Sequence, residues 1–220
     1  MTYIQSFDDA RANPVAAEAG QDDLMSRIGV RMTFAKDEEI YGQGENADLI
    51  YRVISGTVRT SRFMSDGRRP IGDFYYAGDL FGLETGDEHD MAAEALSDCT
   101  ILVANRQALR GAGGEDELKR LVWEATVRDL ESARQHLTLL VRKTACERVA
   151  SFLLGLANRR RGGHVELAMG RQDTADYLGL TIETVSRMIT QLQAAKVVEF
   201  KGSRLFRICD AEALQEMAAG

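Results

Sequence analysis

The chain has 220 residues and a formal net charge of −7, from 34 acidic and 27 basic residues. Its length suggests one or two domains, and a hydrophobic content of 45% is ordinary for a globular protein. No run of about 20 apolar residues is present, so we expect no transmembrane helix. The N-terminus lacks a basic start followed by an apolar block, which argues against a secretory signal.

The cysteines Cys99, Cys146 and Cys209 are odd in number and far apart, without the C-x-x-C spacing of a metal site. We therefore expect no metal ligation and a reducing cytoplasm. Cys146 and Cys209 fall in or near the C-terminal domain, which leaves control by thiol oxidation open as an alternative to inert thiols.

Residues 1–22 have the composition of a loosely ordered arm. Residues 23–114 predict many short strands separated by glycine turns, with Gly56 dividing two strands and Asp66-Gly67 forming a hairpin-type turn. Such closely spaced strands are typical of a barrel or roll. We expect this segment to form one β domain.

Residues 115–141 predict one long helix, which starts acidic and contains neither Gly nor Pro. Leu118, Val122 and Ala125 form an apolar stripe suited to the chain's own core. Two further sets of residues, each repeating every seven positions, form a second stripe along the helix. This stripe either packs on the β domain or joins two copies of the chain, and a helix that is apolar on two faces favours a homodimer. The expected interface residues are Trp123, Thr126, Leu130, Ala133, Leu137 and Leu140.

Residues 142–220 contain a helix, a turn at Gly179, a second helix from about Ile182 to Ala195, and two strands around Lys201. Thr181 is a suitable N-cap for the second helix. This order predicts a winged helix-turn-helix, a DNA-binding motif. Residues 142–207 hold 12 basic and 6 acidic side chains, a local charge of +6 that leaves −13 for the rest. The basic segment suits a polyanion, although the whole chain is acidic.

The second helix predicts a base-reading face. Glu183 and Arg187 are four residues apart, and Ser186 lies between them. Arg suits the O6 and N7 atoms of guanine, while a carboxylate can accept a hydrogen bond from N4 of cytosine. The alternative is a surface ion pair between Glu183 and Arg187. Phosphate contacts, which position a protein without specifying sequence, are expected from Arg171, Gln172, Thr181, Thr184 and Lys201.

The stretches "GQGENADLIYRVISGTVR", "YYAGDLFGLE" and "DTADYLGLTIETVSRMITQLQAAKVVEFKGSRLFRI" resemble the Crp/Fnr family of bacterial transcription regulators. The resemblance implies an α+β fold with an N-terminal cyclic-nucleotide-binding-type β-roll, a long dimerisation helix and a C-terminal winged helix-turn-helix. It also implies double-stranded DNA and RNA polymerase as partners. The Glu183-x-x-Ser186-Arg187 pattern is similar to the Fnr and FixK side, which implies a palindrome of TTGAT, about four spacer base pairs, and ATCAA.

Departures from the family pattern narrow the function. No Arg occurs between Arg69 and Arg106, so the phosphate anchor of the cyclic-AMP binders is missing, and acidic residues occupy this stretch. No Cys precedes Cys99, so the four ligands of a [4Fe–4S] cluster are not available there. His89 is the only histidine in the β domain and is expected in a polar loop, which argues against haem. What remains resembles the FixK branch, linked to oxygen-limited gene programmes.

We therefore expect a cytoplasmic, homodimeric DNA-binding regulator without a cofactor. No Ser–His–Asp, paired-carboxylate or metal-site pattern stands out, so we expect no enzyme. Two alternatives remain: gating of the same regulator by an unidentified small effector in the β-roll, and a module that only binds a cyclic nucleotide.

Overall fold

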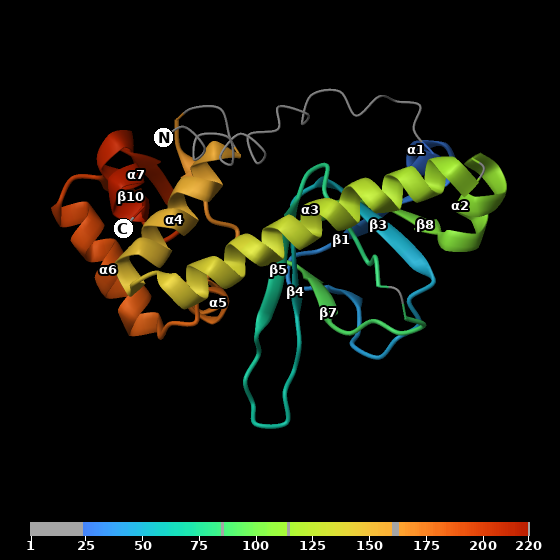
Figure 1. Ribbon diagram of the computed structural model, residues 1–220, viewed down its shortest axis with the longest axis horizontal. Helices are drawn as coiled ribbons and strands as arrows, with labels where there is room; N and C mark the ends of the chain where they lie inside the picture. The colour runs from blue at the N-terminus through green and yellow to red at the C-terminus, as the bar shows by residue number, and fades with distance from the viewer. Residues whose placement is uncertain (1–23, 85, 114, 160–162, 220) are drawn as a thin grey trace. The chain divides into compact units, whose positions relative to one another are not determined.

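The computed structural model describes residues 24–84, 86–113, 115–159 and 163–219 (Figure 1). The arm expected over residues 1–22 lies outside the described residues. The chain divides into two compact units, with the boundary between Arg134 and Gln135. None of the described helices is long and apolar enough to cross a membrane.

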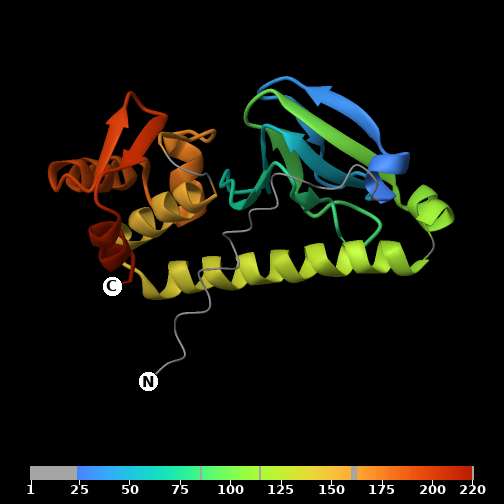
Figure 2. The ribbon, with the colours of Figure 1, turned by 90° about the horizontal axis from the view of Figure 1, so that it is seen from above.

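The N-terminal unit contains two four-stranded antiparallel sheets, which confirms the expected β-roll (Figure 2). In the first sheet the strand order is β1-β8-β3-β6, and in the second it is β2-β7-β4-β5. The strands are β1 (Val30–Phe34), β2 (Glu39–Tyr41), β3 (Leu49–Ser55), β4 (Thr57–Ser61), β5 (Ile71–Tyr76), β6 (Leu80–Phe81), β7 (Ala92–Ala95) and β8 (Cys99–Asn105).

Gly56 lets the chain pass from β3 in one sheet to β4 in the other. Its φ of 93° is a conformation that side chains with a Cβ rarely adopt. A Cβ built at this position would also lie 2.5 Å from Sγ of Cys99, so the neighbouring strand leaves no room for one. The expected division of two strands at Gly56 is therefore confirmed, with two steric reasons for glycine.

Aromatic rings fill the space between the two sheets. Tyr51 lies 5.0 Å from Phe81 between ring centroids, and both belong to the buried core. His89 stacks on Tyr41 at 3.6 Å and is only 2% exposed. His89 lies in the loop between β6 and β7, as expected, and its sequence neighbours are acidic, but its ring is buried against Tyr41 rather than exposed.

Three helices cover the first sheet: α1 (Leu24–Ile28), α2 (Arg106–Gly113) and α3 (Glu115–Arg142). Leu118 and Ala125 of α3 are buried in a second core together with Leu109 of α2, and Val122 packs against it. Figure 2 shows the first half of α3 running alongside the roll. The inward-facing stripe predicted for this helix is therefore confirmed.

The opposite face of α3 carries large apolar side chains that the chain does not cover. Trp123 is 70% exposed, Leu130 50% and Leu137 62%. Thr126 and Ala133 are exposed as well, whereas Leu140 is partly buried. Two further apolar residues of this helix are also exposed, Val127 and Val141.

The C-terminal unit contains the expected winged helix-turn-helix. After α4 (Ala145–Asn158) come β9 (Val165–Glu166), α5 (Arg171–Leu178), α6 (Ile182–Ala194), β10 (Val198–Lys201), β11 (Leu205–Ile208) and α7 (Ala211–Ala219). The three strands form a sheet in the order β10-β11-β9. The long helix expected over residues 115–141 ends at Arg142, and α4 begins at Ala145. Thr144 separates the two helices by capping α4. Its hydroxyl accepts a hydrogen bond from the backbone N–H of Glu147, and its own N–H donates to the Glu147 carboxylate.

Asp129 on α3 faces the acidic side chains of the roll. Burial first, and then the negative charges of Asp73 and Asp79, raise the pKa of Asp129 to about 7. Glu84 adds to this repulsion, and Arg128 opposes it. The Asp73 carboxylate accepts a hydrogen bond from the hydroxyl of Ser132, one turn further along α3.

Because ionisation of Asp129 is unfavourable in this environment, we expect the free energy of unfolding to depend on pH. The folded-state pKa lies above the unfolded value, so the folded state binds the extra proton and the penalty grows as pH rises from about 4 to 7. Asp129→Asn should therefore raise the free energy of unfolding at about pH 8 and have little effect at about pH 4. Urea unfolding at both pH values measures this. An equal effect at both would contradict the electrostatic origin.

Candidate nucleic-acid interface

The helix-turn-helix turn depends on Gly179. This residue has φ 60° and ψ 40°, and its N–H donates to the carbonyl of Ala175 to end α5. Such a left-handed residue is the usual end of a helix that is followed at once by another element. Thr181 then caps α6, because its hydroxyl accepts from the N–H of Thr184 at 3.2 Å. The predicted turn and cap are both present.

Helix α6 has a buried face and an exposed polar face. Val185, Met188, Ile189 and Leu192 are buried, and each is at most 7% exposed. Glu183, Ser186 and Arg187 lie together on the exposed face. Among the described ion pairs none joins Glu183 to Arg187. Both charged groups are therefore available for another partner, and the alternative of a surface pair is not seen.

The carboxylate of Glu183 is held in its charged form. Hydrogen bonds from its own backbone N–H and from the Thr181 hydroxyl lower the pKa of Glu183. The first turn of a helix also favours a negative charge. This carboxylate can therefore accept hydrogen bonds without first losing a proton.

The residues expected to contact phosphates differ in their surroundings. The guanidinium carbon of Arg171 lies 4.8 Å from the centre of the Phe200 ring, Nη1 is buried without a hydrogen-bond partner among the described residues, and burial lowers the pKa of Arg171. The amide of Gln172 donates to Asp176 at 2.7 Å. Lys201 is exposed at the end of β10, beside the turn at Gly202.

Arg148 on α4 is a structural residue of this unit that the sequence interpretation missed. Its Nη1 donates to the carbonyl of Leu178 at 2.9 Å, its Nη2 to Leu140 at 2.8 Å and its Nε to Lys143 at 2.9 Å. One guanidinium therefore joins the end of α3 to the end of α5, next to the turn. A lone Arg on an amphipathic helix gives no sequence signal for this role.

His136 makes a second connection from α3 to the same turn. Its Nε2 lies 2.6 Å from the carbonyl oxygen of Tyr177, to which an imidazole N–H donates. The His136 and Tyr177 rings also stack at 4.0 Å. Together with Arg148, this contact fixes the carbonyl groups that end α5. Neither the heptad pattern nor the helix-turn-helix pattern predicts it.

This arrangement defines a winged helix-turn-helix protein with a polar face on its second helix. Two family models match the chain: a cyclic nucleotide-binding domain over residues 31–113 and a Crp-like helix-turn-helix domain over residues 147–217. The two matches follow the order of the roll and the C-terminal unit.

The names of similar proteins indicate which class of DNA-binding regulator the chain belongs to. The nitrogen fixation regulation protein FixK of Azorhizobium caulinodans is 43% identical over 201 residues, covering 88% of this chain and 81% of that protein. FixK of Rhizobium meliloti is 37% identical, covering 94% of this chain and 97% of that one. The structure of FixK2 from Bradyrhizobium japonicum superimposes with a TM-score of 0.83 at 42% identity, covering 88% and 98%. The chain belongs to the Crp/Fnr family of transcription regulators, in its FixK-like branch, and carries the family's DNA-binding helix-turn-helix.

The role of Arg148 can be tested by its removal. Arg148→Ala leaves the carbonyls of Leu140 and Leu178 without their donor, and hydrogen bonds to charged groups contribute roughly 1.5–3 kcal/mol each. We expect a loss of roughly 2–4 kcal/mol in the free energy of unfolding of the C-terminal unit. Thermal and urea unfolding measure it. Arg204→Ala, which removes one exposed bond to the carbonyl of Ala168, is the matched control and should cost much less. Equal losses would contradict the connecting role.

Proposed function

We propose that the protein binds DNA as a homodimer and reads a palindrome of TTGAT, about four spacer base pairs, and ATCAA. The observation that carries this proposal is the exposed face of α6, where Glu183, Ser186 and Arg187 lie together without an ion pair between the two charges. Regulators of this motif place the second helix in the major groove. Two such helices read the two half-sites of a palindrome.

The residue chemistry fits one G·C pair in each half-site. Arg187 can donate to O6 and N7 of guanine, and the ionised Glu183 can accept from N4 of cytosine. Ser186 is short enough to approach a base edge or a thymine methyl group. Arg171, Gln172, Thr181, Thr184 and Lys201 would contact phosphates.

The uncovered face of α3 supports the homodimer. Trp123, Leu130 and Leu137 repeat every seven residues and are at least half exposed. Val127 and Val141 lie four residues after Trp123 and Leu137, which gives the alternating spacing of a coiled-coil seam. The dimer interface would comprise Trp123, Thr126, Leu130, Ala133, Leu137 and Leu140, with Leu140 also packing beside Gly179 of its own chain.

The physiological setting is proposed from the relatives. Two of them are named nitrogen fixation regulation proteins, and one of Vibrio cholerae is named a fumarate and nitrate reduction regulatory protein. We infer control of genes used under oxygen limitation, in the cytoplasm, through contacts with RNA polymerase. The relatives' names describe regulators, which supports a protein without catalytic activity. An effector in the roll is the second candidate, favoured by the match to a cyclic nucleotide-binding domain.

Base reading predicts a loss confined to one position. Arg187→Ala and Glu183→Ala should each remove roughly 1–3 kcal/mol of discrimination at the G·C pair of each half-site. On an operator in which that pair is replaced by A·T, both variants should bind as weakly as the native protein. The measurement is a matrix of these variants against operators changed one base pair at a time.

Lys201→Ala is the matched control for this experiment. A phosphate contact should weaken binding to every operator alike and reduce the salt slope by about one per subunit. If Glu183→Ala and Arg187→Ala lose the same affinity for every operator, these two residues act only through DNA phosphates, as Lys201 does, or by stabilising the fold. The proposed reading of the G·C pair would then be wrong.

The homodimer predicts that a charge on the exposed stripe gives monomers. Leu137→Glu buries a carboxylate against its own copy in a dimer, which is strongly unfavourable, whereas a monomer keeps the side chain in water. Operator affinity should fall steeply, because one half-site provides too few contacts and the second is no longer bound intramolecularly. Sedimentation measures the mass. Thr138→Glu, which adds the same charge off the stripe, should remain dimeric, and a dimeric Leu137→Glu would exclude this seam.

A further inference from the structure

The C-terminal end of α3 lies against the helix-turn-helix and belongs to the same unit. The ring of His136 stacks on the ring of Tyr177, with 4.0 Å between their centroids. One turn later, the side chain of Leu140 lies beside Gly179, where a Cβ would come within 3.3 Å of it. Leu137, the residue after His136, is exposed on the proposed dimer seam. The same turns of α3 therefore contact the helix-turn-helix on one side and carry the proposed seam on the other.

Two neighbouring carbonyl groups at the end of α5 are held from this side. The imidazole of His136 donates a hydrogen bond to the carbonyl of Tyr177, at 2.6 Å from Nε2. The guanidinium of Arg148 donates to the carbonyl of Leu178 at 2.9 Å and to that of Leu140 at 2.8 Å, which joins α5 to α3 a second time. Because the acceptors are backbone atoms, they cannot turn away as side chains do. These bonds therefore fix both the position and the direction of the end of α5 relative to α3.

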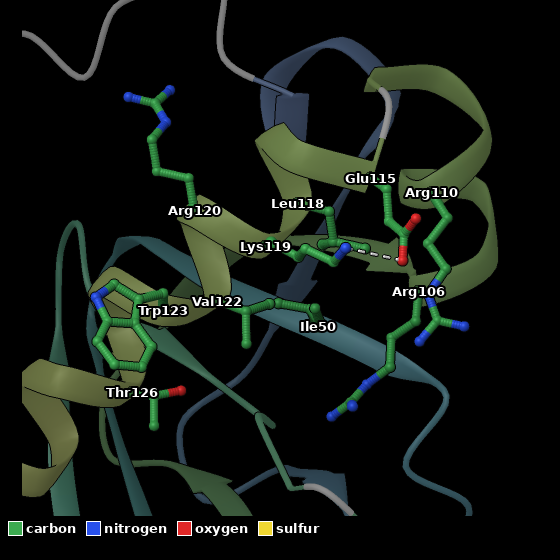
Figure 3. A pocket seen from close by; sticks show the side chains of 10 residues that line it. All are labelled: Ile50, Arg106, Arg110, Glu115, Leu118, Lys119, Arg120, Val122, Trp123 and Thr126. Carbon is green, nitrogen blue, oxygen red and sulfur yellow. Dashed lines mark ion pairs between the residues drawn. The ribbon is translucent and has the colours of Figure 1, made fainter.

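The first half of α3 has different surroundings. It borders a cavity of about 630 Å³ in the N-terminal unit, which Leu118 and Trp123 line together with four basic side chains (Figure 3). Lys119, one of the four, pairs with Glu115 of the same helix at 3.1 Å, and an exposed pair of this kind contributes little to the position of a helix. Apolar packing, in which side chains can adjust, is the main contact of this half. The C-terminal end is positioned by directional hydrogen bonds.

Only three residues separate the held carbonyls from α6, and each is fixed by a hydrogen bond. The N–H groups of Gly179 and Leu180 both donate to the carbonyl of Ala175. The hydroxyl of Thr181 accepts from the N–H of Thr184 and caps α6. A displacement at the end of α5 is therefore passed to α6 without a flexible joint, and with it to the exposed polar face of α6.

The spacing of two half-sites places a demand on this connection. Each added base pair moves the second half-site by about 3.4 Å along the duplex and by about 35° around it. A dimer contacts both half-sites at once only where the separation and the rotation of its two α6 helices match those of the DNA. If α6 is fixed to α3, and α3 is joined to its copy, one spacer length is matched. A looser connection would accept several lengths, with a lower affinity for the best one.

We propose that His136 is a positioning residue that restricts the spacer length which the dimer accepts. Its hydrogen bond and its ring stack hold the end of α5 against the helix that carries the seam, and the direction of α6 follows. The proposal rests on the proposed homodimer and palindrome. It deepens them, because it assigns the choice of spacer to a residue outside both the base-reading face and the seam.

The test measures operator affinity as a function of spacer length with the full-length protein. The operators keep the same TTGAT and ATCAA half-sites, and their spacers are shorter or longer than the preferred one by up to two base pairs. We expect the native protein to lose roughly tenfold or more in affinity for each base pair added or removed. His136→Ala should lose roughly tenfold on the preferred operator and much less on its neighbours, so that the ratio between them falls.

Two further variants of His136 separate its hydrogen bond from its ring. His136→Gln keeps an N–H donor at a similar reach and should retain most of the native spacer preference. His136→Phe keeps a flat ring without a donor and should be as permissive as His136→Ala. Lys201→Ala is the control for a general loss of affinity, because a lost phosphate contact should weaken binding by the same factor at every spacer length. Circular dichroism and sedimentation check that each variant is folded and dimeric.

Three results would overturn this proposal alone. The first is an unchanged ratio between operators in His136→Ala, since a residue that only stabilises the fold affects all operators alike. The second is a His136→Gln variant as permissive as His136→Ala. The third is a monomeric His136→Ala, which would place the residue in the seam. A native protein that binds a single half-site as tightly as the palindrome would instead refute the proposed homodimeric reading, and the role of His136 with it.

Discussion

The C-terminal unit depends on the hydrogen bonds that the Arg148 guanidinium donates to the backbone carbonyls of Leu140 and Leu178. A helix end leaves carbonyl groups without donors, and here two helices end close together, α3 near Leu140 and α5 at Leu178. One planar guanidinium satisfies both, because its donors diverge in a fixed geometry. Gly179 supplies the left-handed residue that the turn requires, and Arg148 and His136 fix its position relative to α3. The orientation of α6, and with it the exposed face of Glu183 and Arg187, follows from these contacts.

The distribution of charge then explains how an acidic chain can carry a DNA-binding domain. The segment from Arg142 to Arg207 has a net charge of +6, while the remainder carries −13. Exposed charges more than about 10 Å away are largely screened at 0.1 M salt, so the acidic roll has little effect on the local attraction of the basic segment. In the N-terminal unit, Glu84 and Asp90 of the roll and Asp129 of α3 line one cavity. These negative charges would repel an anionic ligand such as a cyclic nucleotide, after which the matching domain family is named.

The sequence predicted those features that depend on periodicity or on single residues with restricted conformations. Gly179, Thr181 and the apolar spacing of Val185 to Leu192 determine the helix-turn-helix by local chemistry, and Gly56 marks a strand division for the same reason. The burial of His89 was missed because a stack on Tyr41 joins residues 48 positions apart, and no local pattern reports it. Arg148 was missed for a similar reason, since its acceptors are carbonyls, which every residue has. The candidate base-reading residues were predictable because exposure on a helix follows from spacing alone.

Helix α3 connects these observations, because the same turns of the helix carry a buried stripe, an exposed apolar stripe and an acidic residue that faces the roll. Its inner stripe is buried with Leu109, its outer stripe exposes Trp123, Leu130 and Leu137, and Asp129 lies between them toward the roll. Leu130, in the outer stripe, is the next residue after Asp129 on the same helix. The repulsion between Asp129 and the acidic residues of the roll therefore acts on the same turns of α3 that expose the outer stripe.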